Sequence, residues 1–163
     1  QPPNARGRAA CRTRRADALK LITFGRHARD VALGELIGLE GAYEQGTNLH
    51  HALLLAGQHL RRHPDAQPVV LVVTDGEPTA HLEADGYAAF DWPPSPQTLA
   101  ATVGEVDRLT SLRASITIFR LGDDPRLARF VDSVARRCGG KVVAPTLDGL
   151  GAEVVANYLR ARR

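Results

Sequence analysis

Residues 69–81 read VVLVVTDGEPTAH, and this stretch decides the fold. It opens with five apolar residues, four of them valine, and such an unbroken apolar run is typical of a parallel strand buried on both faces. Thr74 and Asp75 follow directly, and Gly76 then lets the chain turn. Because open α/β sheets bind their ligands outside the carboxyl ends of their strands, the stretch predicts that Asp75 lies at a ligand-binding edge.

Strands and helices alternate on both sides of this stretch. A two-strand hairpin is expected at 19–24 and 30–33, and the strand at 69–73 is expected to lead into a long loop. The other expected elements are helices at 49–63, 96–112, 126–138 and from 148 onward, and strands at 115–121 and 141–145. This order predicts a doubly wound, Rossmann-like α/β fold, with a mainly parallel sheet covered by helices on both faces.

The charge is unevenly distributed along the chain. The formal net charge is +3, but residues 1–17 hold five arginines against Asp17 alone. The remaining 16 basic and 17 acidic residues leave a body with a net charge of −1. We therefore expect a basic, disordered tail at 1–17 and a single domain at 18–163. Contact with nucleic acid or an acidic partner is the alternative for the tail.

The start of the chain, its lack of long apolar segments and its cysteines lead to expectations about its origin and its cellular location. The chain contains no methionine and begins at Gln1, so we expect it to be an N-terminally truncated piece of a longer protein. It has neither a signal peptide pattern nor an apolar run of the roughly 20 residues that span a membrane, which predicts a cytoplasmic protein without membrane contact. Cys11 and Cys138 lack metal-ligand and C-x-x-C spacing, and they fit a reducing compartment.

The residues around Asp75 exclude several kinds of site. A phosphotransferase of the haloacid dehalogenase type needs a second aspartate two residues earlier, where this chain has Val73. The chain also lacks a glycine-rich loop that ends in Lys-Ser/Thr, and it lacks a G-x-S-x-G turn. A hard divalent cation fits better, because Mg²⁺ prefers carboxylate and hydroxyl oxygens, and the loops at 46–48 and 74–76 offer them. The alternative is that Asp75 caps a turn or helix.

The segments that contain these loops resemble a known metal site. YEQGTNLHHAL (43–53) and VVLVVTDGEPT (69–79) resemble the second and third segments of the metal-ion-dependent adhesion site of von Willebrand factor A (vWA) domains. The resemblance covers about residues 17–163, and it implies that Thr47 and Asp75 coordinate Mg²⁺. FGRHARD, TDGEPTAHLE and TIFRLGDDPRLARFVD are most similar to bacterial intracellular A-domain proteins associated with MoxR or magnesium-chelatase-like AAA+ ATPases.

The first metal-binding segment of that family, Asp-x-Ser-x-Ser, is absent from this sequence. The resemblance places it at the end of a central strand, between the strands expected at 19–24 and 69–73. We therefore expect a vacant slot between these two strands, and about two of the five metal-site positions in this chain. With so few ligands, Mg²⁺ binding is expected to be weak or absent in this fragment.

Residues beside the two expected ligands would form the rim that contacts a partner. Long loops at the carboxyl edge of a sheet are often functional, which supports partner contacts from the loop after Asp75. The expected rim residues are Gly46, Asn48, Gly76, Glu77 and His81.

Four histidines and a tryptophan have plainer interpretations. His59 and His63 have the i, i+4 spacing of a zinc pair, but no third ligand is evident, so we expect an exposed helix face. His50 and His51 are expected on the helix surface as well, with a position at the rim as the alternative. Trp92 is expected to fold back and pack over a helix, and an exposed interface anchor is the alternative.

The sequence therefore predicts a protein-interaction module and not an enzyme. The resemblance implies that Mg²⁺ joins protein oxygens to an acidic side chain of the partner, a MoxR-like AAA+ ATPase or its client. One alternative is a metal-assisted hydrolase that uses Asp75, with Glu77 as the base. The other is nucleic-acid binding through the arginine-rich tail, and we do not expect nucleic acid to be the partner.

Overall fold

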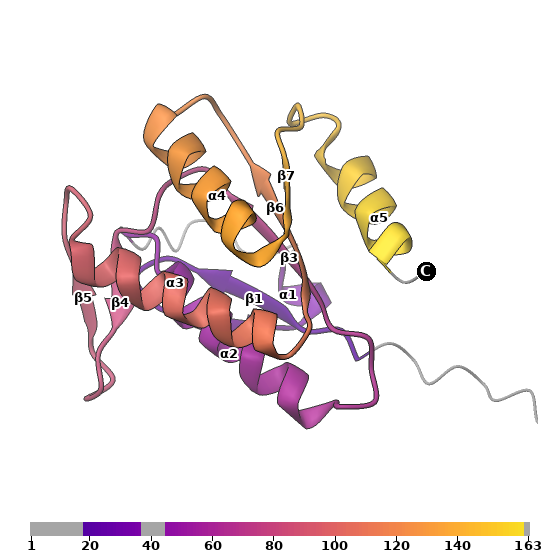
Figure 1. Cartoon of the computed structure of the whole chain (residues 1–163), viewed down its shortest axis with the longest axis horizontal. Coiled ribbons are helices and arrows are strands. Elements are labelled where there is room, and N and C mark those ends of the chain that lie inside the picture. Colours follow the sequence, from indigo (N-terminus) through magenta and orange to yellow (C-terminus); the bar gives the residue numbers. More distant parts are fainter. Residues whose placement is uncertain (1–17, 37–44, 162–163) are drawn as a thin grey trace, which may run out of the picture.

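A parallel sheet lies at the centre of the protein (Figure 1). The computed structural model describes residues 18–36 and 45–161, so the expected basic tail at 1–17 lies outside the described residues. Within them, β3 (Val69–Thr74), β6 (Ser115–Arg120) and β7 (Lys141–Val143) pair in the order β3-β6-β7. Both pairings are parallel, which confirms the expected α/β class.

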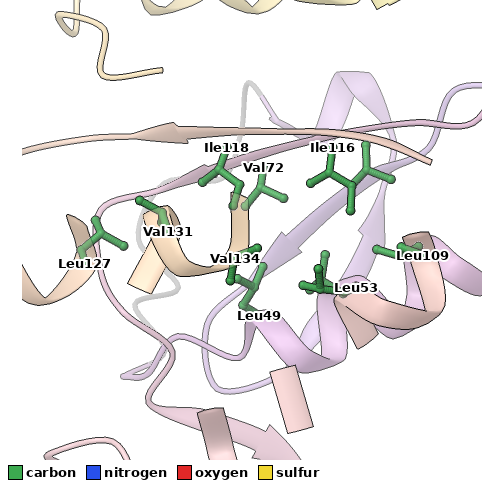
Figure 2. Close-up of a cluster of buried hydrophobic side chains, with 11 residues drawn as sticks. Leu49, Leu53, Val72, Leu109, Ile116, Ile118, Leu127, Val131 and Val134 are labelled. Atoms are coloured by element: carbon green, nitrogen blue, oxygen red, sulfur yellow. The ribbon is translucent and has the colours of Figure 1, made fainter. Parts of the chain in front are cut away.

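Helices cover both faces of this sheet. One face packs on α2 (Leu49–Arg62), α3 (Pro96–Ser111) and α4 (Pro125–Cys138), whereas α5 (Leu150–Ala161) contacts β3 and β6 from the other side (Figure 1). Successive strand residues point to opposite faces, so alternate residues of β3 and β6 enter the first layer. Figure 2 shows these side chains meeting the helices. The buried cluster consists of Leu49, Leu53, Val70, Val72, Val106, Leu109, Ile116, Ile118, Leu127, Val131 and Val134.

Two antiparallel hairpins flank the sheet. The first joins β1 (Leu21–Phe24) to β2 (Ala28–Val31) and is followed by the one-turn helix α1 (Leu33–Leu36). The second joins β4 (Ala80–Leu82) to β5 (Ala88–Phe90). In Figure 1 the second hairpin extends at the edge of the molecule, beside α3.

These hairpins correct the expected boundaries in two places. The second strand was expected at 30–33 but spans Ala28–Val31, because Ala28 and Val31 are its buried residues and Leu33 already opens α1. The stretch between β3 and α3 was expected to be a loop, but it contains β4 and β5. The terminal helix also begins at Leu150, two residues later than expected, after a turn in which the Thr146 hydroxyl accepts a hydrogen bond from the Gly149 N–H.

A groove of about 1220 Å³ separates the first hairpin from the sheet. Among the described residues β1 pairs with β2, and β3 pairs with β6, so neither strand hydrogen-bonds across the groove. The groove thus lies where the vacant slot was expected. Elements β1, α2, β3 and α5 supply its walls, which include Leu21, Ile22, Leu53, Leu60, Val73 and Leu159.

Candidate functional site

The loop before α2 and the loop after β3 meet at the carboxyl end of β3. A Cβ atom on residue 76 would lie 3.5 Å from the Thr47 hydroxyl oxygen, so this hydroxyl faces Gly76 directly. The backbone of Thr47 fixes the approach, because its N–H donates to the Thr79 hydroxyl (2.9 Å) and its carbonyl accepts from the Thr79 N–H (3.0 Å). The Thr47 side chain is therefore held beside the residue that follows Asp75.

Asp75 lies on a tight turn that leaves its side chain exposed. The buried Thr74 hydroxyl donates to the Gly76 carbonyl over 2.9 Å and stabilises this turn. Three helices begin at other caps: the side chains of Asn48, Ser95 and Asp124 accept the first-turn N–H groups of α2, α3 and α4. None of these three helices uses Asp75, so its carboxylate is available at the surface beside the Thr47 loop.

The expected rim residues have different surroundings. Gly46 has a φ of +122°, and a Cβ there would lie 3.2 Å from a ring carbon of Phe90, so this position requires glycine. Asn48 is fully buried and serves as the cap of α2, which places it beneath the rim. His81 is half-buried, with its Nδ1 2.9 Å from the Thr98 hydroxyl. Asn48 and His81 therefore support the loops and do not present a free contact surface.

Glu77 belongs to a small charged cluster on the same side. Its Oε1 atom is buried and forms no hydrogen bond with any described residue, and it lies 3.8 Å from Nη1 of Arg126. The Arg126 guanidinium lies 5.7 Å from the centre of the Trp92 ring. Trp92 thus lies beside Arg126 of α4 but remains 64% exposed, so the expectation that it folds back and packs over a helix is only partly met.

The first turn of α2 holds residues that the sequence analysis placed on an ordinary helix surface. His50 is buried, and its Nδ1 accepts a hydrogen bond of 3.0 Å from the backbone N–H of Leu82 in β4. The Nδ1 of His51 accepts an equally long bond from the N–H of Ala28 in β2. The surface interpretation is therefore wrong for His50, and both histidines connect α2 to a hairpin. The sequence signal was the pair of adjacent histidines in the first turn after the Asn48 cap.

Burial lowers the pKa of both imidazoles. For His50 the smaller causes are the positive charges that His81, His51 and Arg108 can carry, and for His51 the smaller cause is His27. Both histidines therefore favour the neutral form, which can accept a hydrogen bond at Nδ1.

The oxygens of Thr47 and Asp75 are the chemical type that binds Mg²⁺. Residues 18–36 and 45–161 contain no group of three or more His, Cys, Asp or Glu side chains that could hold a metal ion. Thr47 and Asp75 supply two oxygens of the type that Mg²⁺ prefers, and a complete Mg²⁺ site would need further oxygens. The ring centres of His59 and His63 lie 4.3 Å apart with the rings tilted by 46°, and the Nε2 of His59 lies 2.8 Å from the Ala18 carbonyl oxygen.

No helix in the described part of the chain combines the length and the apolar character required to cross a membrane.

Comparisons with known proteins give a consistent result. The family model described as "Rv0959-like protein, vWA domain" matches residues 9–159. Uncharacterized protein Rv0959 of Mycobacterium tuberculosis and uncharacterized protein Mb0984 of Mycobacterium bovis are each 65% identical to the chain over 157 residues. Each alignment covers 94% of this chain but only 23% of the relative, so the chain spans about a quarter of the length of these proteins.

Proposed function

Because this chain belongs to the Rv0959-like vWA domain family, we propose that it is a protein-interaction module whose contact with a partner depends on Mg²⁺. Thr47 and Asp75 would supply two of the oxygens that hold the ion. The observation that carries this proposal is the contact between the two loops, in which the Thr47 hydroxyl lies 3.5 Å from the Cβ position of residue 76.

The two residues have complementary tasks in this proposal. The exposed Asp75 carboxylate contributes negative charge at the end of β3, and the Thr47 hydroxyl contributes a neutral oxygen from the adjacent loop. When bound, Mg²⁺ would supply a positive charge and a coordination position for an acidic side chain of the partner. Because Thr47 is fixed by hydrogen bonds to Thr79, its hydroxyl needs little reorganisation to hold the ion.

The partner that we propose is a MoxR-like AAA+ ATPase or its client, as the resemblance of the segments at 24–30, 74–83 and 117–132 implies. In this proposal the chain performs no catalysis of its own. Its task is to present the site, and Glu77, whose Oε1 lies 3.8 Å from Nη1 of Arg126, has no catalytic role in this proposal.

The first experiment measures Mg²⁺ binding to this chain by calorimetry. Two oxygen ligands offset only part of the cost of dehydrating Mg²⁺, so we expect weak binding that saturates only at millimolar Mg²⁺ and disappears in Asp75→Ala. Tight binding that survives Asp75→Ala would place the ion elsewhere and contradict the proposal.

The second experiment measures binding of the chain to a purified MoxR-like AAA+ ATPase, in Mg²⁺ and in a chelator. We expect Mg²⁺-dependent binding that Asp75→Ala and Thr47→Val abolish. Asp132→Ala, which removes an exposed carboxylate from α4, is the matched control and should bind normally. Binding that is equal in the chelator, or lost in all three variants, would refute the proposed role of the site.

A further inference from the structure

Two consecutive histidines in the first turn of α2 hold two different hairpins. The N–H of Ala28, in β2, donates to Nδ1 of His51 over 3.0 Å. The N–H of Leu82, in β4, donates to Nδ1 of His50 over the same distance. These strands lie far apart in the sequence, so the adjacent imidazoles join both hairpins to the same helical turn.

The chemistry of these bonds fixes the protonation state of each ring. A backbone N–H can only donate, so each Nδ1 must carry a lone pair, and the ring must be neutral with its proton on Nε2. Protonation places a hydrogen on Nδ1 as well, and two donors then face each other. An imidazolium therefore cannot keep its bond to the hairpin.

The groups that face His50 do not compensate for a positive charge on it. Nε2 of His50 lies 3.8 Å from Oε1 of Glu105, which is a potential counter-charge from α3. That carboxylate is already hydrogen-bonded to Arg108, whose charge opposes a second cation nearby. From β4, His81 approaches with its ring centre 6.3 Å away and opposes the charge too.

The surroundings of His51 act in the same direction. The ring of His27, from the turn between β1 and β2, lies 6.2 Å away at nearly a right angle. Burial is the main cause of the lowered pKa of His51, and the charge that His27 can carry adds to it.

We infer that His50 and His51 form a proton-sensitive clasp, which holds the backbone amides of Ala28 and Leu82 against α2 when the rings are neutral and releases these two amides when the rings are protonated. The inference depends on the hydrogen bonds of the hairpins and not on the proposed function. The clasp is also connected to the candidate site. The Thr47 carbonyl accepts hydrogen bonds from the N–H of Thr79, which precedes β4, and from the N–H of Ala80, the first residue of β4.

The sign of the pH dependence follows from the lowered pKa values. In the open form each imidazole regains its ordinary pKa of about 6.5, whereas in the closed form the pKa is lower. The open form thus binds more protons, so the closed form loses stability as the pH falls below about 6.5. At about pH 5.5, protonation of one freed ring favours opening by about tenfold.

The clasp is tested by measuring the hydrogen exchange of single amides by NMR at about pH 7.5 and about pH 5.5. After correction for the intrinsic pH dependence of exchange, we expect the protection of the Ala28 and Leu82 amides to fall by about tenfold. The amide of Ile118, in the central strand β6, should keep its protection. Unchanged protection of Ala28 and Leu82 would overturn the inference.

Three variants separate the two halves of the clasp. The Oδ1 atom of an asparagine can accept a hydrogen bond near the position of Nδ1 and does not titrate. His51→Asn should therefore make the protection of Ala28 independent of pH while Leu82 still responds, and His50→Asn should do the reverse. His63→Asn, at the exposed C-cap of α2, is the matched control and should leave both responses intact.

A direct titration keeps the inference testable if His50→Asn does not fold. The imidazole signals of His50 and His51 in the unaltered chain should then titrate below pH 6.5, together with the loss of protection. Titration at or above pH 6.5 would overturn the clasp.

Discussion

Asn48 connects the start of α2 to the first hairpin with both ends of its side chain. Its Oδ1 accepts from the N–H of His51, and its Nδ2 donates to the carbonyl of Arg26 over 2.8 Å. Thr or Asn before an apolar helical run is a common start signal, so the sequence allows Thr47 or Asn48 as the cap, and the structure shows Asn48 in this role. The bond to Arg26 could not be predicted, because it depends on where the hairpin lies.

Replacing Asn48 should cost more than the loss of an ordinary cap. In Asn48→Ala the helix loses its cap, which costs about 1 kcal/mol, and the carbonyl of Arg26 loses its donor, which costs about 1–3 kcal/mol. We expect a total loss of about 2–4 kcal/mol in the free energy of unfolding, measured by urea denaturation. Ser95→Ala removes the cap of α3 and is the control, with an expected loss of about 1 kcal/mol. Equal losses in both variants would show that the bond to Arg26 contributes nothing.

The candidate site, too, could be predicted from the sequence only in part. Thr47 and Asp75 could be proposed because each lies beside the end of a recognisable element, and the structure brings their loops together. The roles of His50 and His51 could not, because their partners are backbone groups of hairpins whose positions the sequence does not specify. The partners of such buried polar groups depend on tertiary packing, so sequence patterns carry little information about them.

At the scale of the elements, the helices and the first hairpin were predictable, whereas the β4–β5 hairpin was not. The α4 helix was expected at 126–138 and spans Pro125–Cys138, because Pro and Gly signals limit it at both ends. The β4–β5 hairpin has three-residue strands, too short to show clear alternation, although Asp85-Gly86 at its turn is a known hairpin signal. Gly86 indeed has a φ of +88°.

The turn from α4 to β7 gives a test at this scale. A Cβ on Gly140 would lie 2.7 Å from the carbonyl oxygen of Ile116 and 2.9 Å from the sulfur of Cys138. Gly140→Ala must therefore displace β6 or β7, and we expect a loss of about 1–3 kcal/mol in thermal or urea unfolding.

Gly104→Ala is the matched control for that substitution. A Cβ there meets nothing within 4 Å, and the residue lies inside α3. Alanine should stabilise the helix by about 0.5–1 kcal/mol. If both glycine variants change the stability equally, then the close packing of the Gly140 turn is not important.

At the scale of the whole molecule, the groove between β1 and β3 is the main departure from a continuous sheet. Unpaired strand edges and apolar walls attract another strand, because the backbone groups of β3 on that side lack a partner strand among the described residues. A slot at this place was expected because the Asp-x-Ser-x-Ser segment is absent from the sequence.

Filling the groove should stabilise the chain. We predict that an apolar strand fused ahead of residue 18, ending in Asp-x-Ser-x-Ser, raises the melting temperature by several degrees, because about 1 kcal/mol moves it by roughly 2–4 °C at this size. Analytical ultracentrifugation should show less self-association. A fused segment of the same composition in scrambled order is the control. An unchanged melting temperature, or an equal rise with the scrambled segment, would contradict the prediction.

The groove between β1 and β3 also offers a way to divide the fold into two polypeptides. One polypeptide would be a short strand that fits the groove, and the other would be this chain. The two would recombine only when other fused proteins bring them together. Divided in this way, the domain would work as a complementation reporter, in which the gain in structure signals the proximity of two molecules in a cell.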